Sequence, residues 1–113
     1  MKGADAEERT LAYLTGQGHQ LLARNYRIRG GEIDLITRQG EVIVFVEVKH
    51  RTRVSYGSPL EGVSVRKILR LRRTALFYLL RTFGTDQLPC RFDVVAIAGP
   101  VCGGTLEHVE NAF

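Results

Sequence analysis

Three residues near the middle of the chain have types and a spacing suited to metal-dependent hydrolysis. Asp34 is followed after twelve residues by Glu47, and one further residue separates Glu47 from Lys49. Carboxylates are hard oxygen ligands of the kind that Mg²⁺ prefers, and a bound divalent ion lowers the pKa of a water toward neutrality. An ammonium group beside such an ion can orient the water and offset charge in the transition state. The three residues therefore indicate phosphodiester hydrolysis, with Mg²⁺ or Mn²⁺ as the cofactor.

A central strand must hold two of these residues. Residues 42–49 are apolar on both alternating faces until Glu47 and Lys49 appear together on one of them. Charge at the end of a covered strand is costly unless it is paired or bound to a metal. A strand-end ion pair between Glu47 and Lys49, with Asp34 in a local hydrogen bond, is the structural alternative to an active site.

A hairpin is needed to bring in Asp34. If Gln39-Gly40 forms the turn, Asp34 faces Phe45 and Glu32 faces Glu47 on the neighbouring strand. Asp34 and Glu47 are then diagonal neighbours on one face, with Cα atoms about 7–8 Å apart. Glu32 becomes a further candidate metal ligand. A slip of one residue would move Asp34 to the other face, so the hypothesis depends on the register.

The remaining elements follow from periodicity and from turn and cap residues. We predict a helix over 4–16, strands over 20–28, 32–37 and 42–49, a helix over 65–83, a strand over 92–98 and a short edge strand over 105–109. Ser64 is the expected N-cap of the long helix, which ends at Gly84. Its predicted apolar stripe consists of Val65, Ile68, Leu69, Leu76, Leu79, Leu80 and Phe83. The order αβββαβ predicts one α/β domain over 1–113, with helices on a mixed sheet.

Composition excludes several classes of protein. No apolar run reaches the roughly 20 residues that span a bilayer, and the acidic N-terminus is unlike a signal peptide, so we expect a cytoplasmic protein. Cys90 and Cys102 are too few for a disulfide framework or a four-cysteine zinc site, and the three histidines lack metal-ligand spacing. We expect two free thiols and no zinc.

Positive charge is concentrated in one part of the chain. The net charge is +4, yet residues 49–81 contain nine basic residues and one acidic residue. On the long helix, Arg66, Lys67, Arg70 and Arg73 form one stripe at spacings of three and four. Arg51 and Arg53 extend this charge from the strand that carries Glu47. Such a surface suits backbone phosphates, and without a run of stacking aromatics it favours duplex or branched DNA over single strands.

Several motifs taken together resemble the YraN-type family, a widespread and uncharacterised bacterial group. They are Gly3-x-x-x-Glu7, Arg24-Asn25, Gly31-Glu-Ile-Asp-Leu-Ile36, Phe45-Val-Glu-Val-Lys49, Arg51, Lys67, Arg91-Phe-Asp93 and Asn111-Ala-Phe113. The core of this family is similar to archaeal Holliday-junction resolvases. The resemblance implies a restriction-endonuclease-like fold of the PD-(D/E)xK type, with Asp34, Glu47 and Lys49 as the nuclease triad. It also implies that Glu7 is an extra acidic residue near the metal.

Three functions stay open at this point. The first is a Mg²⁺-dependent, structure-selective endonuclease acting on DNA, with branched DNA among its candidate substrates and a two-fold homodimer as the expected form for symmetric cleavage. The second is a non-catalytic nucleic-acid-binding module of the same fold. The third is an assembly factor whose basic surface meets an acidic protein. For Arg91-Phe-Asp93 we favour a structural role, with Phe92 in the core and Asp93 capping or paired with Arg91.

Overall fold

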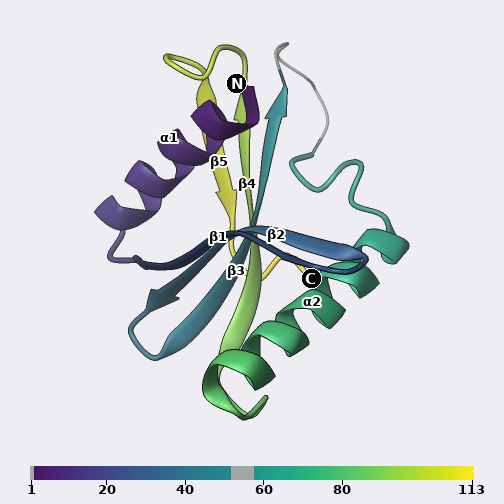
Figure 1. Ribbon diagram of the computed structural model, residues 1–113. Helices are drawn as coiled ribbons and strands as arrows, with labels where there is room; N and C mark the ends of the chain where they lie inside the picture. Colours follow the sequence, from purple (N-terminus) through teal and green to yellow (C-terminus); the bar gives the residue numbers. More distant parts are fainter. Residues whose placement is uncertain (1, 52–57) are drawn as a thin grey trace.

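The computed structural model describes residues 2–51 and 58–113, with side chains from Asp5 onward. The elements are α1 (Lys2–Gly16), β1 (Gln20–Ile28), β2 (Gly31–Gln39), β3 (Val42–Arg51), α2 (Val65–Phe83), β4 (Cys90–Ala98) and β5 (Thr105–Val109). The strands form one sheet in chain order, β1-β2-β3-β4-β5 (Figure 1). All neighbours pair antiparallel except β3 and β4, which are parallel and are connected through α2. This confirms the predicted αβββαβ order, the mixed sheet and the final edge strand.

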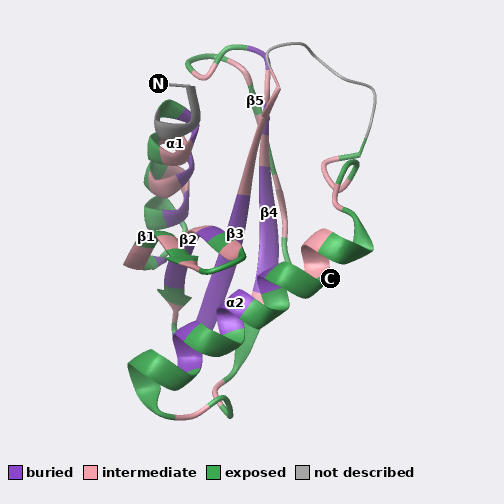
Figure 2. Cartoon of the chain, turned by 45° about the vertical axis from the view of Figure 1, so that its right-hand side comes forward, coloured by how far each residue is buried: buried purple, intermediate pink, exposed green. Residues whose placement is uncertain are grey.

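The two helices cover opposite faces of the sheet. On the α2 face, Ile43 and Phe45 of β3 pack against Leu71 and Tyr78. On the α1 face, Val44 and Val46 of the same strand join a cluster with Leu14. The centre of β3 is buried on both faces, as the purple segments of Figure 2 show. The predicted alternation of faces along this strand is therefore confirmed.

Helix α2 has its predicted ends but not its predicted buried face. The hydroxyl of Ser64 accepts a hydrogen bond from the Lys67 backbone, and Gly84 adopts the left-handed conformation that ends the helix. The buried residues are Leu71, Thr74, Ala75, Tyr78 and Leu79. Of the predicted stripe, only Leu79 is buried, whereas Val65 and Leu69 are 73% and 62% exposed. The stripe was wrong because apolar residues at helical spacing occur on more than one side of α2, so periodicity alone does not select the side that packs.

A close contact between α2 and β2 explains how the helix is seated. A Cβ added at Gly31 would lie 2.0 Å from Oγ1 of Thr74 and 3.5 Å from the carbonyl oxygen of Arg70. No side chain fits in that space, so glycine allows the helix backbone to approach the start of β2. The Thr74 hydroxyl is itself held by a hydrogen bond to the Arg70 carbonyl oxygen, 2.8 Å away. Since Thr74 belongs to the buried face of α2, this contact allows that face to lie close to the sheet.

The β2–β3 register differs from the predicted one by two residues. Leu35 pairs with Val46, and Gln39 pairs with Val42. The two-residue turn is therefore Gly40-Glu41, with Gly40 at a φ of 61°, rather than Gln39-Gly40. Glycine at the first turn position supplies the positive φ that a tight hairpin of this kind needs. A shift of two preserves the face of every side chain, so Asp34 and Glu47 still lie on one face, as predicted.

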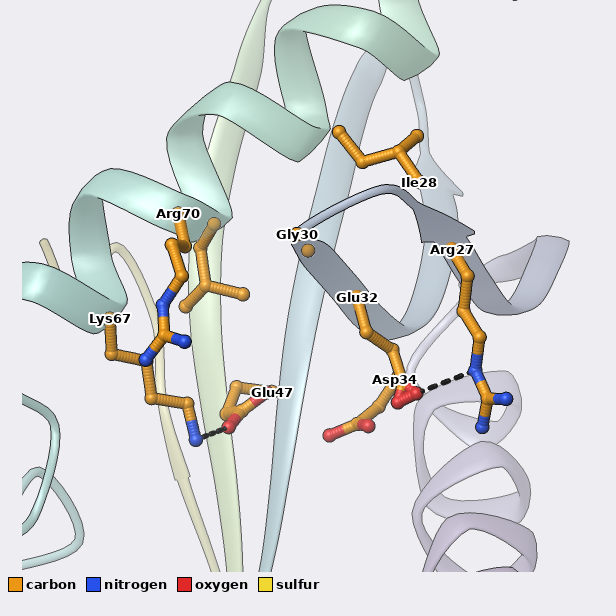
Figure 3. Close-up of a pocket in the computed structure, with 10 residues that line it drawn as sticks. Arg27, Ile28, Gly30, Glu32, Asp34, Glu47, Lys67 and Arg70 are labelled. Carbon is orange, nitrogen blue, oxygen red and sulfur yellow. Dashed lines mark hydrogen bonds and ion pairs between the residues drawn. The ribbon is translucent and has the colours of Figure 1, made fainter.

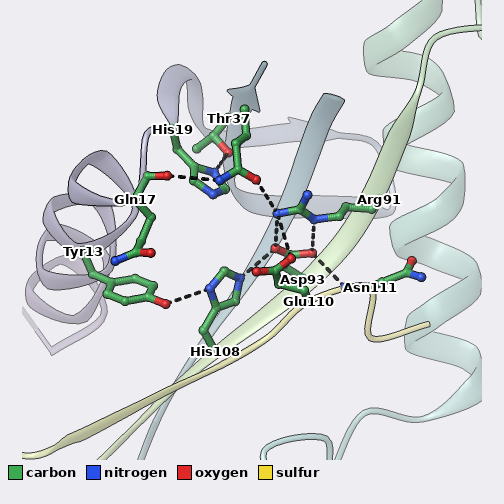
Figure 4. A network of polar contacts seen from close by, with 10 residues as sticks. Tyr13, Gln17, His19, Thr37, Arg91, Asp93, His108, Glu110 and Asn111 are labelled. Carbon is green, nitrogen blue, oxygen red and sulfur yellow. Dashed lines mark hydrogen bonds and ion pairs between the residues drawn. The ribbon is translucent and has the colours of Figure 1, made fainter. Parts of the chain in front are cut away.

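The predicted structural role of Arg91-Phe-Asp93 is confirmed. Asp93 is fully buried, and its Oδ1 lies 3.0 Å from Nε of Arg91 and 3.0 Å from the donating backbone nitrogen of Asn111. Its other oxygen lies 2.7 Å from Nε2 of His108, whose Nδ1 is 3.0 Å from the Tyr13 hydroxyl (Figure 4). The network ties α1, β4, β5 and the C-terminal residues together. Phe92, on the other face, belongs to the core.

The predictions about the two cysteines and about membrane-spanning segments can be compared with the structure. Cys90 and Cys102 are free thiols, and both residues are exposed. In the described ranges, no helix has both the length and the apolar character required to cross a bilayer.

Candidate metal and nucleic-acid site

The candidate site lies where strand β2 separates from β3. The paired register ends at Leu35 and Val46. Asp34 lies one residue beyond Leu35, and its Oδ2 accepts a hydrogen bond at 2.8 Å from the backbone N–H of Val48, two residues beyond Val46. The side chain of Asp34 thus supplies an acceptor just beyond the last backbone pair. Continuing the register by one residue sets Asp34 opposite Glu47, so the two carboxyl groups are direct rather than diagonal neighbours.

The two carboxyl groups are close enough to interact strongly. Burial first, and then the charge of Glu47, raise the pKa of Asp34 to about 7, while the Val48 N–H opposes the rise. A side-chain hydrogen bond with Glu47 and the charge of Glu7 also raise this pKa. The metal-free fold therefore favours a protonated Asp34 up to about pH 7, and a cation placed beside the two carboxyl groups would favour its ionised form instead.

The pKa of Asp34 predicts how stability depends on pH. In the folded protein this pKa is about 7, against an ordinary value of 3.8. Because the fold favours the protonated form, the resulting stabilisation is complete below pH 3.8 and is lost as the pH rises through 7. The side-chain amide of an Asp34→Asn variant would keep an acceptor for Val48 and a donor for Glu47 at every pH. We therefore expect metal-free Asp34→Asn to exceed the wild-type melting temperature at pH 8 by more than at pH 5. Equal differences at the two pH values, measured by thermal denaturation, would contradict the raised pKa of Asp34.

Helix α2 brings positive charge to this carboxyl pair. Nζ of Lys67 forms an ion pair with Oε2 of Glu47, whose side chain is only 10% exposed. Arg70, one turn further along α2, forms no ion pair with any residue that the structure describes. The Ser64 cap and the Gly31 contact position the first turns of α2, and so both cationic side chains.

These groups line a cavity of about 510 Å³, which we call the carboxylate cleft. Its lining residues are Arg27, Ile28, Gly30, Gly31, Glu32, Asp34, Glu47, Lys67, Arg70 and Leu71. Figure 3 shows Lys67 and Arg70 reaching from α2 toward Glu47, with Asp34 and Glu32 across from them. The cleft therefore has cationic and carboxylate groups facing one another around open space.

Glu32 and Arg27 occupy the far side of the carboxylate cleft. Nε of Arg27 lies 2.9 Å from Oε2 of Glu32, so this carboxylate, a candidate metal ligand by sequence, has a cation of its own. Sequence reasoning gave Arg27 no role. The only feature of the sequence that could have drawn attention to Arg27 is its position close to the Arg24-Asn25 motif. The spacing of residues along the chain does not show that β1 brings Arg27 to the carboxylate cleft.

Lys49 and Glu7 lie at the margin of the site. Nζ of Lys49 donates to the carbonyl oxygen of Glu61, and Lys49 does not line the carboxylate cleft. Burial first, and then the charges of Arg51 and Lys67, lower the pKa of Lys49. Glu7 on α1 acts on Asp34 through its charge without lining the cleft. Both remain close enough to influence the carboxyl pair.

Of the other predicted nucleic-acid-binding residues, Arg66 and Arg73 lie on α2, and Arg51 lies at the end of β3. Arg66 and Arg73 are exposed on α2, and the guanidinium of Arg73 lies 5.9 Å from the ring centroid of Phe77. Arg51 donates to the Glu61 carbonyl oxygen at 3.1 Å. Arg53 lies outside the described residues. The predicted basic stripe thus continues from the rim of the carboxylate cleft along α2.

The donor set fits a Mg²⁺ or Mn²⁺ ion bound by two carboxylates. Within residues 2–51 and 58–113, no group of three or more His, Cys, Asp or Glu is arranged to hold a metal. Mg²⁺ commonly takes only one or two carboxylates and completes its shell with waters and substrate phosphate oxygens. Asp34 and Glu47, whose carboxyl groups are close enough for the charge of Glu47 to raise the pKa of Asp34, are the residues that would hold such an ion.

The architecture and the position of the acidic pair define the class of protein. A five-stranded mixed sheet between two helices, with this pair at the point where two strands separate, is a restriction-endonuclease-like α/β fold. The chain belongs to the uncharacterised protein family UPF0102, whose model matches residues 6–97. This agrees with the YraN-type family predicted from the motifs.

Curated relatives match the chain along nearly its whole length. A UPF0102 protein of Deinococcus radiodurans is 47% identical over 106 residues, which cover 93% of this chain and 86% of the relative. One from Lachnoclostridium phytofermentans is 46% identical over 113 residues, covering 100% and 92%. One from Pseudomonas putida is 44% identical over 112 residues, covering 98% and 90%. These similarities establish the family, and the function must be argued from the site.

Proposed function

We propose that this protein is a divalent-metal-dependent endonuclease that hydrolyses phosphodiester bonds of DNA. One observation carries the proposal: two carboxyl groups from adjacent strands converge in an open cleft whose opposite wall is cationic. Two carboxyl groups buried side by side are costly to ionise together, and Lys67 pairs with only one of them, so a divalent cation would stabilise both. The cationic wall, in turn, suits a phosphate group.

Each side chain has a distinct role in the proposed reaction. Asp34, oriented by the Val48 N–H, and Glu47 would hold the ion. A bound Mg²⁺ would polarise a phosphoryl oxygen and supply hydroxide near neutral pH. Lys67 and Arg70 would bind the phosphate that enters the carboxylate cleft. To orient the attacking water, as the sequence suggests, Nζ of Lys49 would leave the Glu61 carbonyl oxygen.

DNA is the proposed substrate because the positive surface extends well beyond the cleft. A helix of 19 residues is about 28 Å long, enough to follow several phosphates of one backbone. Helix α2 contains no acidic residue, and Arg66 and Arg73 continue the line of charge from Arg70. Contacts of this kind fix orientation without reading base sequence. We therefore propose that the protein selects DNA by its shape and favours branched DNA. The same proposal places the protein in the cytoplasm.

Salt dependence tests the phosphate contacts. If Arg66, Arg70 and Arg73 each contact a phosphate, binding of a duplex should weaken with a slope of about −0.9 per contact in log affinity against log salt. Each single Arg→Met variant should reduce that slope by about one unit. The measurement is fluorescence anisotropy with a labelled duplex across a salt series. A flat response would exclude the phosphate model and favour the acidic-protein alternative.

Cleavage tests the enzyme directly. Branched, duplex and single-stranded DNA should be incubated with the protein in Mg²⁺ or Mn²⁺, with a chelator as the control. We expect divalent-dependent cleavage, strongest on branched DNA.

The second candidate function is a non-catalytic binding module of the same fold. It is favoured by the contacts that Lys49 and Lys67 make with other groups of the chain. DNA binding without cleavage under every condition would select that module.

The expected two-fold homodimer is tested separately. Symmetric cleavage of a junction needs two sites, so the proposal includes a dimer formed by an isologous interface. Sedimentation velocity of the full chain, alone and with a junction, measures the number of copies. A monomer on the junction would remove symmetric cleavage while leaving hydrolysis itself open to test.

A further inference from the structure

Lys67 forms an ion pair with Glu47, one of the two carboxylates that the metal ion would need. Its Nζ forms an ion pair with Oε2 of Glu47, and the Glu47 side chain is 10% exposed whereas that of Lys67 is 38% exposed. The more exposed partner, Lys67, is therefore the one with open space into which it can move. An ammonium group and a divalent ion cannot both have full use of one carboxylate, because each seeks the same negative charge.

The structure places Lys67 there through two independent contacts. The Lys67 backbone N–H donates to Oγ of Ser64 at 3.1 Å, which fixes the first turn of α2. The contact between Gly31 and Thr74 brings the next turn against β2. With the backbone held on both sides, only the flexible four-carbon stem of the lysine can change the position of its charge.

A second acceptor for the Lys67 ammonium is available when nucleic acid enters. Arg70 lines the same carboxylate cleft and forms no ion pair with the described residues, so its guanidinium can bind a phosphate directly. A phosphate held by Arg70 lies one helical turn from Lys67, within reach of its side chain. Charge-assisted hydrogen bonds to a phosphate can replace the ion pair that Lys67 would lose at Glu47.

We propose that Lys67 is a positioning residue that couples metal binding to nucleic-acid binding. Without nucleic acid its ammonium holds Glu47 and competes with the divalent ion. With a phosphate in the carboxylate cleft, the ammonium moves to the phosphate and releases Glu47 to the ion. The coupling is reciprocal, so the ion must also favour the nucleic-acid-bound state. This inference rests on the proposed function and adds regulation to that same site.

Mn²⁺ affinity of the DNA-free protein tests the competition. Lys67→Met removes the competing charge, and we expect Mn²⁺ to bind about fivefold or more tightly by isothermal titration at pH 8, whereas Lys67→Arg stays close to wild type. Arg66→Met is the matched control, because it removes one positive charge from an exposed position on the same helix turn. A similar gain in Arg66→Met would reduce the effect to net charge, and no gain in a folded Lys67→Met would overturn the inference.

The reciprocal effect uses DNA affinity as its readout. At matched ionic strength, Ca²⁺ should favour duplex binding in wild type about fivefold more than in Lys67→Met, with uncut DNA verified on a gel. An equal Ca²⁺ effect in both proteins would overturn the coupling. Failure of the proposed function gives a different result: neither wild type nor Lys67→Met would then bind Mn²⁺, or Glu47→Gln would bind it as well as wild type does. Melting temperatures of all variants confirm that the proteins compared are folded.

Discussion

Asp34→Asn and Glu47→Gln should each reduce Mg²⁺-dependent cleavage by at least about a hundredfold, since each removes a charged ligand from a two-carboxylate site. The effect is large because a single carboxylate would then hold the metal ion, and waters would have to fill the rest of its coordination shell. DNA binding should be kept or strengthened, because removing a carboxylate reduces the repulsion between the protein and the phosphates of DNA. The measurements are single-turnover cleavage and anisotropy with the same labelled substrate.

Glu32→Gln is the matched control for these two variants. Glu32 lines the same carboxylate cleft, but its charge is already balanced by Arg27 at 2.9 Å. We expect cleavage by Glu32→Gln to stay within a few-fold of wild type. If all three variants cleave as well as wild type, the activity comes from another site or a contaminant. If Glu32→Gln is as damaged as the others, the register-based assignment of the ligands is wrong.

Asp93→Ala should have the largest effect on stability, costing about 3–5 kcal/mol in the free energy of unfolding. The substitution removes a fully buried carboxylate and leaves the Arg91 guanidinium and the Asn111 N–H without their shared acceptor. Removing one partner of a buried charged network costs more than the network contributes net, because the remaining groups stay desolvated. Urea denaturation monitored by circular dichroism measures the change.

Asp86→Ala is the control for this prediction. Asp86 is exposed, and its carboxylate contacts the Gln87 side chain, so we expect a change within about 0.5 kcal/mol. Asp93→Asn should fall between the two, since it keeps the size of the side chain but loses the charge that faces Arg91 and His108. A loss below about 1 kcal/mol in Asp93→Ala would mean that water replaces the carboxylate and that the network contributes little.

Local sequence patterns determined most of the elements of this fold. The predicted strand over 20–28 and helix over 65–83 have the bounds that the structure shows, because hydrophobic alternation, the Ser64 cap and Gly84 act within a few residues. The faces of β3 were also predictable, since side chains alternate with a fixed period of two. Asp34 and Glu47 could therefore be assigned to one face even though the register was wrong by two residues.

Residues far apart in the chain decided what the sequence could not. Apolar residues occur on more than one side of α2, and packing against the sheet, which includes the close contact between Gly31 and Thr74, selects the buried side. The lysine that meets Glu47 is Lys67 from α2, whereas Lys49, two residues along the same strand, contacts Glu61 instead. Arg27 reaches the carboxylate cleft only through the pairing of β1 with β2. A sequence specifies which side chains can carry charge and on which face of their own element, but the packing of one element against another selects which of these charges meet.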